Sequence, residues 1–185
     1  QKATPPPAAI DIIWDASGSR AGPERKLDLA VIKALPPSAK YRVVVFRNKP
    51  EAAVSFDSSA EVVEYLESVP FDGGTDFAAL SAALDGNAVL RLLFTDGIDT
   101  LSDKPVEFEG AKPIAVVSST VADHEGLRQA CGGAIVDLQT TPVDYAIGEI
   151  LSPSLRVSGI VGTGVADVQG IGRTALTEMI LNAPA

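Results

Sequence analysis

Short, almost wholly apolar runs alternate along the chain with segments whose apolar residues recur every three or four positions. Continuous apolar runs are typical of parallel strands buried on both faces, and the longer spacing is typical of amphipathic helices. The predicted strands are residues 10–15, 41–46, 88–94, 112–119 and 134–138, with a short antiparallel edge strand at 52–56. The predicted helices are residues 23–35, 59–69, 77–84, 124–131 and 142–151.

The alternation of strands and helices predicts a doubly wound, Rossmann-like α/β fold. Right-handed crossovers would give a mostly parallel six-stranded sheet flanked by helices, with the strand order 3-2-1-4-5-6. Local signals mark the helix ends. Pro23 and Glu24 begin the first helix, and we expect Ser59 to cap the second and Asp123 the fourth.

Composition divides the chain into three parts. Residues 1–9 are rich in proline and alanine and are expected to be a linker, so we interpret the sequence as a piece of a longer protein. Residues 10–151 carry the strand–helix pattern and form the predicted domain. Residues 152–185 are expected to be a short β-rich extension or the start of a following module. That part holds strand signals at 155–162 and 165–168 and a weak helix or strand signal at 176–181.

Charge and cysteine content narrow the classes of partner. The chain has 185 residues and a formal net charge of −9, which argues against a nucleic-acid backbone or an anionic membrane surface as partner. No apolar run is long enough to span a bilayer, so we expect no direct membrane insertion by this chain. Cys131 is the single cysteine, which excludes an internal disulfide and a cysteine-based zinc site; a small buried residue is expected there.

Oxygen-bearing side chains follow the predicted strands at three places. Asp15, Ser17 and Ser19 follow the first strand, Thr75 lies in a glycine-containing loop, and Asp96 follows the strand at 88–94. In the predicted strand order the loops after the first and fourth strands flank one crevice, so these side chains should converge. Carboxylates and hydroxyls are hard ligands, which suit Mg²⁺ best and also Mn²⁺ or Ca²⁺.

Each of these residues also has an ordinary structural interpretation. Asp15 could cap its own loop, Ser17 and Ser19 could be turn residues, Thr75 could be a helix N-cap, and Asp96 could belong to a turn. The joint occurrence of all five in matching loops favours a metal site over these separate roles.

Four neighbouring residues are expected to have lesser roles. Asp76 and Asp99 are interpreted as solvated or outer-sphere charges. Arg20 is expected at the surface, with contact to an acidic partner as the alternative. His124, the single histidine, is expected to be solvated rather than catalytic.

The five residues resemble the metal-ion-dependent adhesion site (MIDAS) of von Willebrand factor type A (vWA) domains. The pattern is Asp-x-Ser-x-Ser at Asp15, Ser17 and Ser19, a distant Thr at Thr75, and an Asp in a Thr-Asp-Gly turn at Asp96. The resemblance implies a parallel sheet wrapped by helices and a metal ion whose open position accepts a carboxylate from a protein partner. It further implies that the three hydroxyls bind the metal directly and that the two carboxylates bind it directly or through water.

The segment 14–20 is also similar to bacterial members of that family in which this domain follows a VIT domain, an arrangement that fits the proline-rich start. Location stays open, and export or membrane anchoring of a longer bacterial protein fits this resemblance.

Three functions remain to be separated. The leading hypothesis is a metal-dependent protein-binding module without enzymatic activity. The second is a serine hydrolase or a magnesium-dependent phosphate-handling enzyme. For that hypothesis the sequence offers neither a Gly-x-Ser-x-Gly elbow nor a phosphate-binding Gly-rich loop, and His124 would have to reach Ser17. The third is a scaffold vWA domain that binds no metal.

Overall fold

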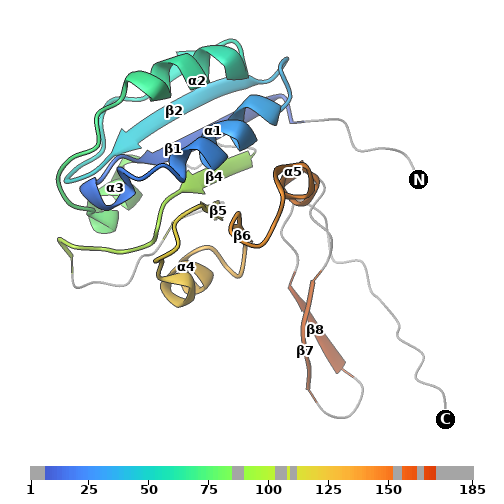
Figure 1. Ribbon diagram of the computed structural model, residues 1–185. Coiled ribbons are helices and arrows are strands. Elements are labelled where there is room, and N and C mark those ends of the chain that lie inside the picture. Colours follow the sequence, from blue (N-terminus) through green and yellow to red (C-terminus); the bar gives the residue numbers. More distant parts are fainter. Residues whose placement is uncertain are drawn as a thin grey trace.

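The computed structural model describes residues 7–84, 90–102, 108, 112–151, 156–161 and 165–169. A six-stranded sheet with packed helices forms its main part (Figure 1). The strand order is β3-β2-β1-β4-β5-β6, as predicted. The strands are β1 (Ala9–Asp15), β2 (Lys40–Phe46), β3 (Val54–Phe56), β4 (Leu90–Phe94), β5 (Ile114–Val117) and β6 (Ile135–Asp137).

Strand β1 lies at the centre of the sheet and is parallel to β2 on one side and to β4 on the other. Strand β3 pairs antiparallel with β2, which confirms the prediction of an edge strand. Every residue of β1 from Ile10 to Asp15 is buried, as its apolar run, interrupted only by Asp11, predicts. The charged residue within that run, Asp11, forms ion pairs with an arginine on each neighbouring strand. Arg42 of β2 lies 2.8 Å and Arg91 of β4 lies 3.8 Å from its Oδ2.

The helices lie where the amphipathic segments predict them. They are α1 (Arg25–Ala34), α2 (Ser59–Ser68), α3 (Phe77–Ala83), α4 (His124–Ala130) and α5 (Val143–Leu151), with a 3-10 turn η1 (Gly18–Arg20) after β1. Helix α1 packs against both α2 and α5. The crossover from β1 to β2, which contains α1, and the crossover from β5 to β6, which contains α4, run in opposite directions along the sheet. Because both connections are right-handed, α4 lies on the face of the sheet opposite to α1 (Figure 1).

This reversal of direction places the candidate site. The chain leaves β1 toward one edge of the sheet and leaves β4 toward the other, although β1 and β4 are neighbours. The loops that follow these two strands therefore lie side by side at the carboxyl end of the sheet. In open α/β sheets this position is where ligands bind.

Two predictions about helix ends have different outcomes. The N-cap of α2 is Ser58 and not Ser59, because the Ser58 hydroxyl accepts a hydrogen bond from Glu61 N at 3.3 Å. Ser59 is instead the first residue of the helix and is buried. Asp123 caps α4 as predicted, accepting a hydrogen bond from Gly126 N at 2.9 Å.

The remaining sequence predictions concern the cysteine, membrane spans and the tail. Cys131 is buried and free, and burial raises the pKa of its thiol to about 12. Within the described residues, no helix is long and apolar enough to cross a membrane. β7 (Arg156–Val161) and β8 (Val165–Gln169) form an antiparallel pair, as the strand signals predict. The segment 176–181 and most of the linker lie outside the described residues, and the division into parts at 9 and 151 stays a prediction.

Candidate metal centre

Backbone hydrogen bonds join the three predicted loops into one structure. Gly18 N donates to Gly73 O at 3.0 Å, which ties the loop after β1 to the loop that carries Thr75. The carbonyl of Thr75 accepts from Thr100 N and Leu101 N, both at 3.1 Å, in the loop after β4. The Thr75 segment is therefore bonded to both of the loops that carry the candidate carboxylates.

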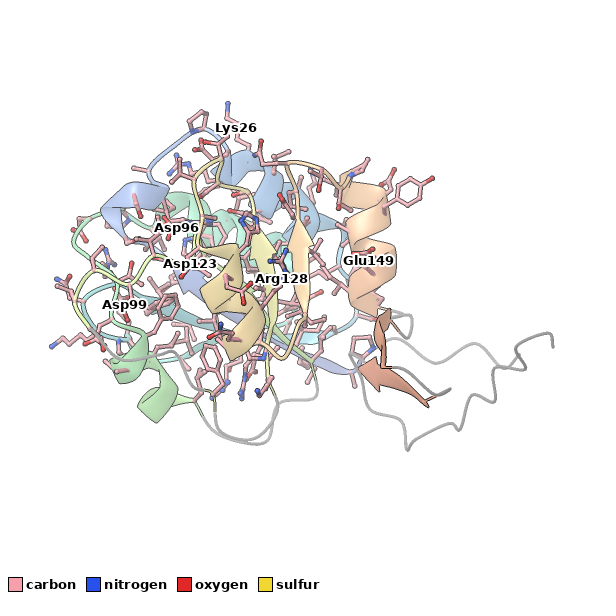
Figure 2. All side chains as sticks on the ribbon, turned by 90° about the horizontal axis from the view of Figure 1, so that it is seen from below. Lys26, Asp96, Asp99, Asp123, Arg128 and Glu149 are labelled. Atoms are coloured by element: carbon pink, nitrogen blue, oxygen red, sulfur yellow. The ribbon has the colours of Figure 1, made fainter. Side chains whose placement is uncertain are left out.

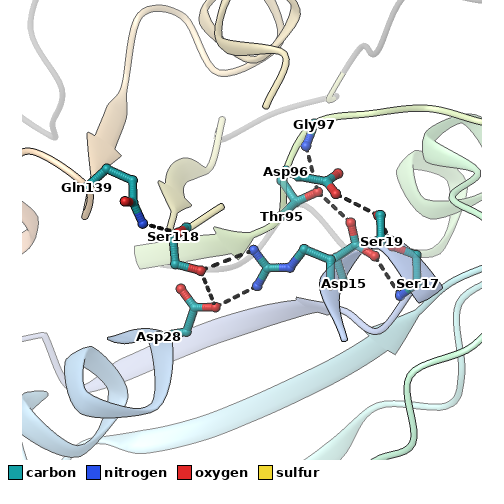
Figure 3. A network of polar contacts seen from close by, with 10 residues as sticks. Asp15, Ser17, Ser19, Asp28, Thr95, Asp96, Gly97, Ser118 and Gln139 are labelled. Atoms are coloured by element: carbon teal, nitrogen blue, oxygen red, sulfur yellow. Dashed lines mark hydrogen bonds and ion pairs between the residues drawn. The ribbon is translucent and has the colours of Figure 1, made fainter. Parts of the chain in front are cut away.

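Asp15 is the last residue of β1, and its buried carboxylate is held at both oxygens. Its Oδ1 accepts a hydrogen bond from Ser17 N at 2.9 Å. Its Oδ2 accepts one from the Thr95 hydroxyl at 2.6 Å. Thr95 Oγ1 in turn accepts from Gly97 N at 3.0 Å, so the turn after β4 orients the carboxylate that ends β1 (Figure 3).

Ser17, Ser19 and Asp96 form a second chain of contacts across the same crevice (Figure 3). The hydroxyls of Ser17 and Ser19 lie 3.2 Å apart, and Ser19 Oγ donates to Asp96 Oδ2 at 2.6 Å. The other oxygen of Asp96 accepts from Ile98 N at 3.0 Å. The turn depends on Gly97, whose φ of +77° is a conformation that side chains disfavour.

Thr75 provides the observation that separates a metal ligand from a helix cap. Its side chain is buried, yet its Oγ1 has no hydrogen-bond partner among the residues that the structure describes. The cap of α3 is the next residue, because Asp76 Oδ1 accepts from Ala79 N at 2.9 Å. The prediction that Thr75 could be a helix N-cap is therefore wrong.

Burial dominates the electrostatics of Asp15. Removal from water raises the pKa of this carboxyl, against the hydrogen bonds from Thr95 and Ser17 and the charge of Arg20, which lower it. A carboxylate that is costly to ionise in a buried site gains from a neighbouring cation.

The structure corrects the prediction for Arg20, which is not at the surface. Its side chain is buried, and its Nη2 lies 2.6 Å from Asp28 Oδ2 on α1. The Ser118 hydroxyl also donates to this carboxylate oxygen, at 2.9 Å. The alternative that Arg20 contacts an acidic partner is overturned with it, because the guanidinium is directed inward and has an internal carboxylate.

Three of these residues were missed from the sequence: Thr95, Asp28 and Ser118. Thr95 directly precedes the candidate ligand Asp96 in the Thr-Asp-Gly turn, and this position in the sequence indicates that it lies near the site. Asp28 lies three, four and seven residues before Val31, Ile32 and Leu35, which is the spacing of the buried helix face. Ser118 has no comparable signal, because its contact depends on tertiary packing.

The other neighbours have structural contacts. Asp99 accepts hydrogen bonds from Phe77 N at 3.3 Å and from Leu101 N at 3.0 Å, so it joins the loop after β4 to α3. His124 Nε2 lies 3.3 Å from Asp137 Oδ2, and its side chain is one third exposed, so it is part-buried rather than fully solvated. Figure 2 shows Asp96, Asp99 and Asp123 on the loops at this end of the molecule, and Asp123 N donates to Asp96 O at 2.8 Å.

The donor set fits a divalent cation of the magnesium type. Two carboxylates and three hydroxyls offer hard oxygen ligands, and one of the hydroxyls is the buried, unpartnered one of Thr75. In the described part of the chain no three His, Cys, Asp or Glu residues group as a metal site. The donor set has two acidic members and three hydroxyls. That composition disfavours zinc and iron, whose sites use imidazole and thiolate.

Comparison with solved structures establishes the fold. A structure titled von Willebrand factor type A from Catenulispora acidiphila matches with a TM-score of 0.56 and 17% identity, over 80% of this chain. The chain has the vWA fold. It spans 42% of the length of that Catenulispora structure. Neither a protein-family description nor a curated protein sequence matches the chain.

Two further structures with the same fold differ in length. The hypothetical protein BatB from Bacteroides thetaiotaomicron matches with a TM-score of 0.53 and 14% identity, over 78% of this chain and 97% of that one. The manganese-loaded TRAP protein of Plasmodium vivax matches with a TM-score of 0.52 and 12% identity, over 77% of this chain and 71% of that one. At such identities the likeness is one of fold, and the site rests on this chain's own residues.

Proposed function

We propose that this chain is a protein-binding module that holds a divalent cation, Mg²⁺ in the first place, at Asp15, Ser17, Ser19, Thr75 and Asp96. The cation would complete its coordination with a carboxylate from a protein partner. The observation that carries the proposal is the Thr75 hydroxyl, which is buried next to the two acidic loops without a hydrogen-bond partner in the described residues.

A buried hydroxyl without a partner is costly, on the order of 1–3 kcal/mol by mutational data. In a scaffold domain that binds no metal, the Thr75 hydroxyl would only destabilise the fold, and valine would fill the same space without that cost. A cation that accepts the Thr75 oxygen as a ligand removes the cost, and it also removes the cost of ionising the buried Asp15. Metal binding thus explains two unfavourable features of one site.

The arrangement of the hydroxyls supports binding rather than nucleophilic catalysis. A nucleophilic serine needs a base within hydrogen-bond reach. The Ser17 hydroxyl lies against the Ser19 hydroxyl, which donates to the Asp96 carboxylate rather than to an imidazole, and the contact that the structure gives for the His124 ring is with Asp137. The manganese in the TRAP structure shows that a protein of this fold can hold a divalent cation.

The partner chemistry follows from the ligand set. Five oxygen donors leave an octahedral ion one position short, and a hard cation prefers a carboxylate there. Ser19 is exposed, whereas the other four donors are buried, so the site meets solvent on the side of Ser19. An acidic side chain of a protein partner can approach from that side.

The function is tested by affinity capture with the immobilised chain from an extract of the source organism. We expect a protein to be retained in Mg²⁺, released by EDTA, and not retained by Thr75→Val. Thr140→Ala, which changes an exposed threonine, serves as the matched control. Retention of the same protein in EDTA, or by Thr75→Val, would refute metal-dependent binding.

A further inference from the structure

The buried pair of Arg20 and Asp28 lies directly behind the candidate metal loop. Arg20 is the last residue of the 3-10 turn that also carries Ser19, and it is next in sequence to that candidate ligand. The Arg20 side chain is 1% exposed and the Asp28 side chain is 0% exposed. A full positive charge is therefore fixed inside the protein beside a site that we assign to a cation.

The guanidinium is in contact with three residues. Asp28 Oδ2 holds its Nη2 at 2.6 Å, and Ser118 Oγ lies 3.5 Å from its Nη1 (Figure 3). The Trp14 ring lies below it, with its centroid 6.0 Å from the guanidinium carbon. Arginine cannot lose its proton in a protein, so the charge is permanent.

The charge of Arg20 acts on Asp15 of the candidate site. It is among the influences that lower the pKa of Asp15, although burial outweighs it. An unbalanced arginine at this place would repel a divalent cation and would cancel part of the attraction of Asp15 and Asp96. Asp28 supplies the balancing charge from α1.

We infer that Asp28 is a positioning residue that neutralises Arg20, so that the carboxylates of Asp15 and Asp96 keep their full attraction for a divalent cation. This inference rests on the proposed function. Arg20 follows Ser19 in the same turn, and Asp28 removes the electrostatic penalty of its buried charge. Neither residue is a ligand of the cation.

Neutralising either partner breaks the same contact but has opposite electrostatic effects. Asp28→Asn leaves the arginine unbalanced, so the Kd for Mg²⁺ is expected to rise by about tenfold. Arg20→Gln removes the repelling charge, and the remaining Asp28 carboxyl either attracts the cation or takes up a proton. The Kd of that variant is expected to stay equal to or fall below that of the unmodified chain.

The experiment is isothermal titration calorimetry with Mg²⁺ on the full chain, at a pH above 7 and well below the melting temperature of each variant. The double variant Arg20→Gln/Asp28→Asn restores a neutral pair and should return the Kd to within about threefold of the unmodified chain. Asp57→Asn removes an exposed carboxylate that pairs with Lys40, and it changes the net charge by the same amount as Asp28→Asn. Its Kd should be unchanged.

The possible outcomes distinguish failure of this inference from failure of the proposed function. If Asp28→Asn and Arg20→Gln weaken Mg²⁺ binding alike, the pair only supports the fold and the charge balance is refuted. If Asp28→Asn does not fold, the comparison of Arg20→Gln with the double variant decides, and weaker binding by Arg20→Gln refutes the inference. If the unmodified chain takes up no Mg²⁺, both the function and the inference fall.

Discussion

The Ser19 hydroxyl donates a 2.6 Å hydrogen bond to Asp96 Oδ2, across 77 positions of sequence. Ser19 lies in the turn after β1 and Asp96 in the turn after β4, so the bond closes the crevice between neighbouring strands. It places a hydroxyl oxygen and a carboxylate oxygen in contact on the exposed side of the candidate site. Under the proposed function, these two residues would hold the cation.

Removing this hydroxyl tests its two roles together. In Ser19→Ala we expect the free energy of unfolding in EDTA to fall by about 1 kcal/mol, since the lost hydrogen bond is at a part-exposed site. We also expect Mg²⁺ binding to weaken, because a ligand is lost. Urea unfolding and calorimetry measure these effects, with Ser38→Ala, at an exposed serine, as the control. Unchanged Mg²⁺ binding would remove Ser19 from the ligand set.

Two buried threonines should respond to the same substitution with opposite signs. Thr95→Val removes the donor to Asp15 and the acceptor for Gly97 N, so we expect a loss of about 1–3 kcal/mol in EDTA. Thr75→Val removes a hydroxyl for which the described residues offer no partner, so stability in EDTA should be equal or greater, by up to about 2 kcal/mol.

Urea unfolding of both valine variants beside the unmodified chain makes this comparison. A destabilised Thr75→Val variant would show that its hydroxyl is already satisfied in the absence of metal.

The pH dependence of stability should carry a contribution from Asp28. Burial raises the pKa of Asp28 to about 6 from the model-peptide value of 3.8, against the opposing charge of Arg20. The folded state then binds the proton more tightly than the unfolded state does. The contribution is therefore fully present below about pH 4 and is lost as pH rises through about 6, by on the order of 2–3 kcal/mol.

Unfolding in EDTA across this pH range measures that contribution. Asp28→Asn cannot titrate there, so its stability should fall less steeply with rising pH. Parallel curves for the two proteins would contradict the raised pKa.

Stabilisation by Mg²⁺ should itself depend on pH through Asp15. Burial raises the pKa of this carboxyl, so a proton competes with the cation at low pH. We expect the Mg²⁺-induced rise in melting temperature to be larger at pH 8 than at pH 5. Asp15→Asn should show no rise at either pH, and an equal rise at both for the unmodified chain would argue against Asp15 as a ligand.

The sheet could be predicted because apolar runs such as Ile10–Trp14, interrupted only by Asp11, have few alternatives to a buried parallel strand. The convergence of the Asp15 and Asp96 loops followed from the strand order alone. The buried pair behind them could not be predicted in the same way. Asp28 has the spacing of the buried helix face, but its partner Arg20 lies in a 3-10 turn of three residues, where no periodicity indicates which way a side chain points.

The site residues show the same division. The sequence predicts five oxygen donors. In the structure, hydrogen bonds join four of them in a row: Asp15 to Ser17 N, the Ser17 hydroxyl to the Ser19 hydroxyl, and the Ser19 hydroxyl to Asp96. Their roles as ligands stay a prediction. The support from Thr95 depends on a contact between adjacent strands, and that contact becomes visible only once the strands are paired.

Thermal unfolding of the unmodified chain and of Thr75→Val, each in Mg²⁺ and in EDTA, tests the metal centre most directly. We predict that Mg²⁺ raises the melting temperature of the unmodified chain, by an amount equivalent to about 2.7 kcal/mol at one hundred times the Kd, and that EDTA reverses it. Thr75→Val should melt at the same or a higher temperature in EDTA and should not respond to Mg²⁺. An unmodified chain that ignores Mg²⁺, or a valine variant that responds like it, would contradict a cation site built on Thr75.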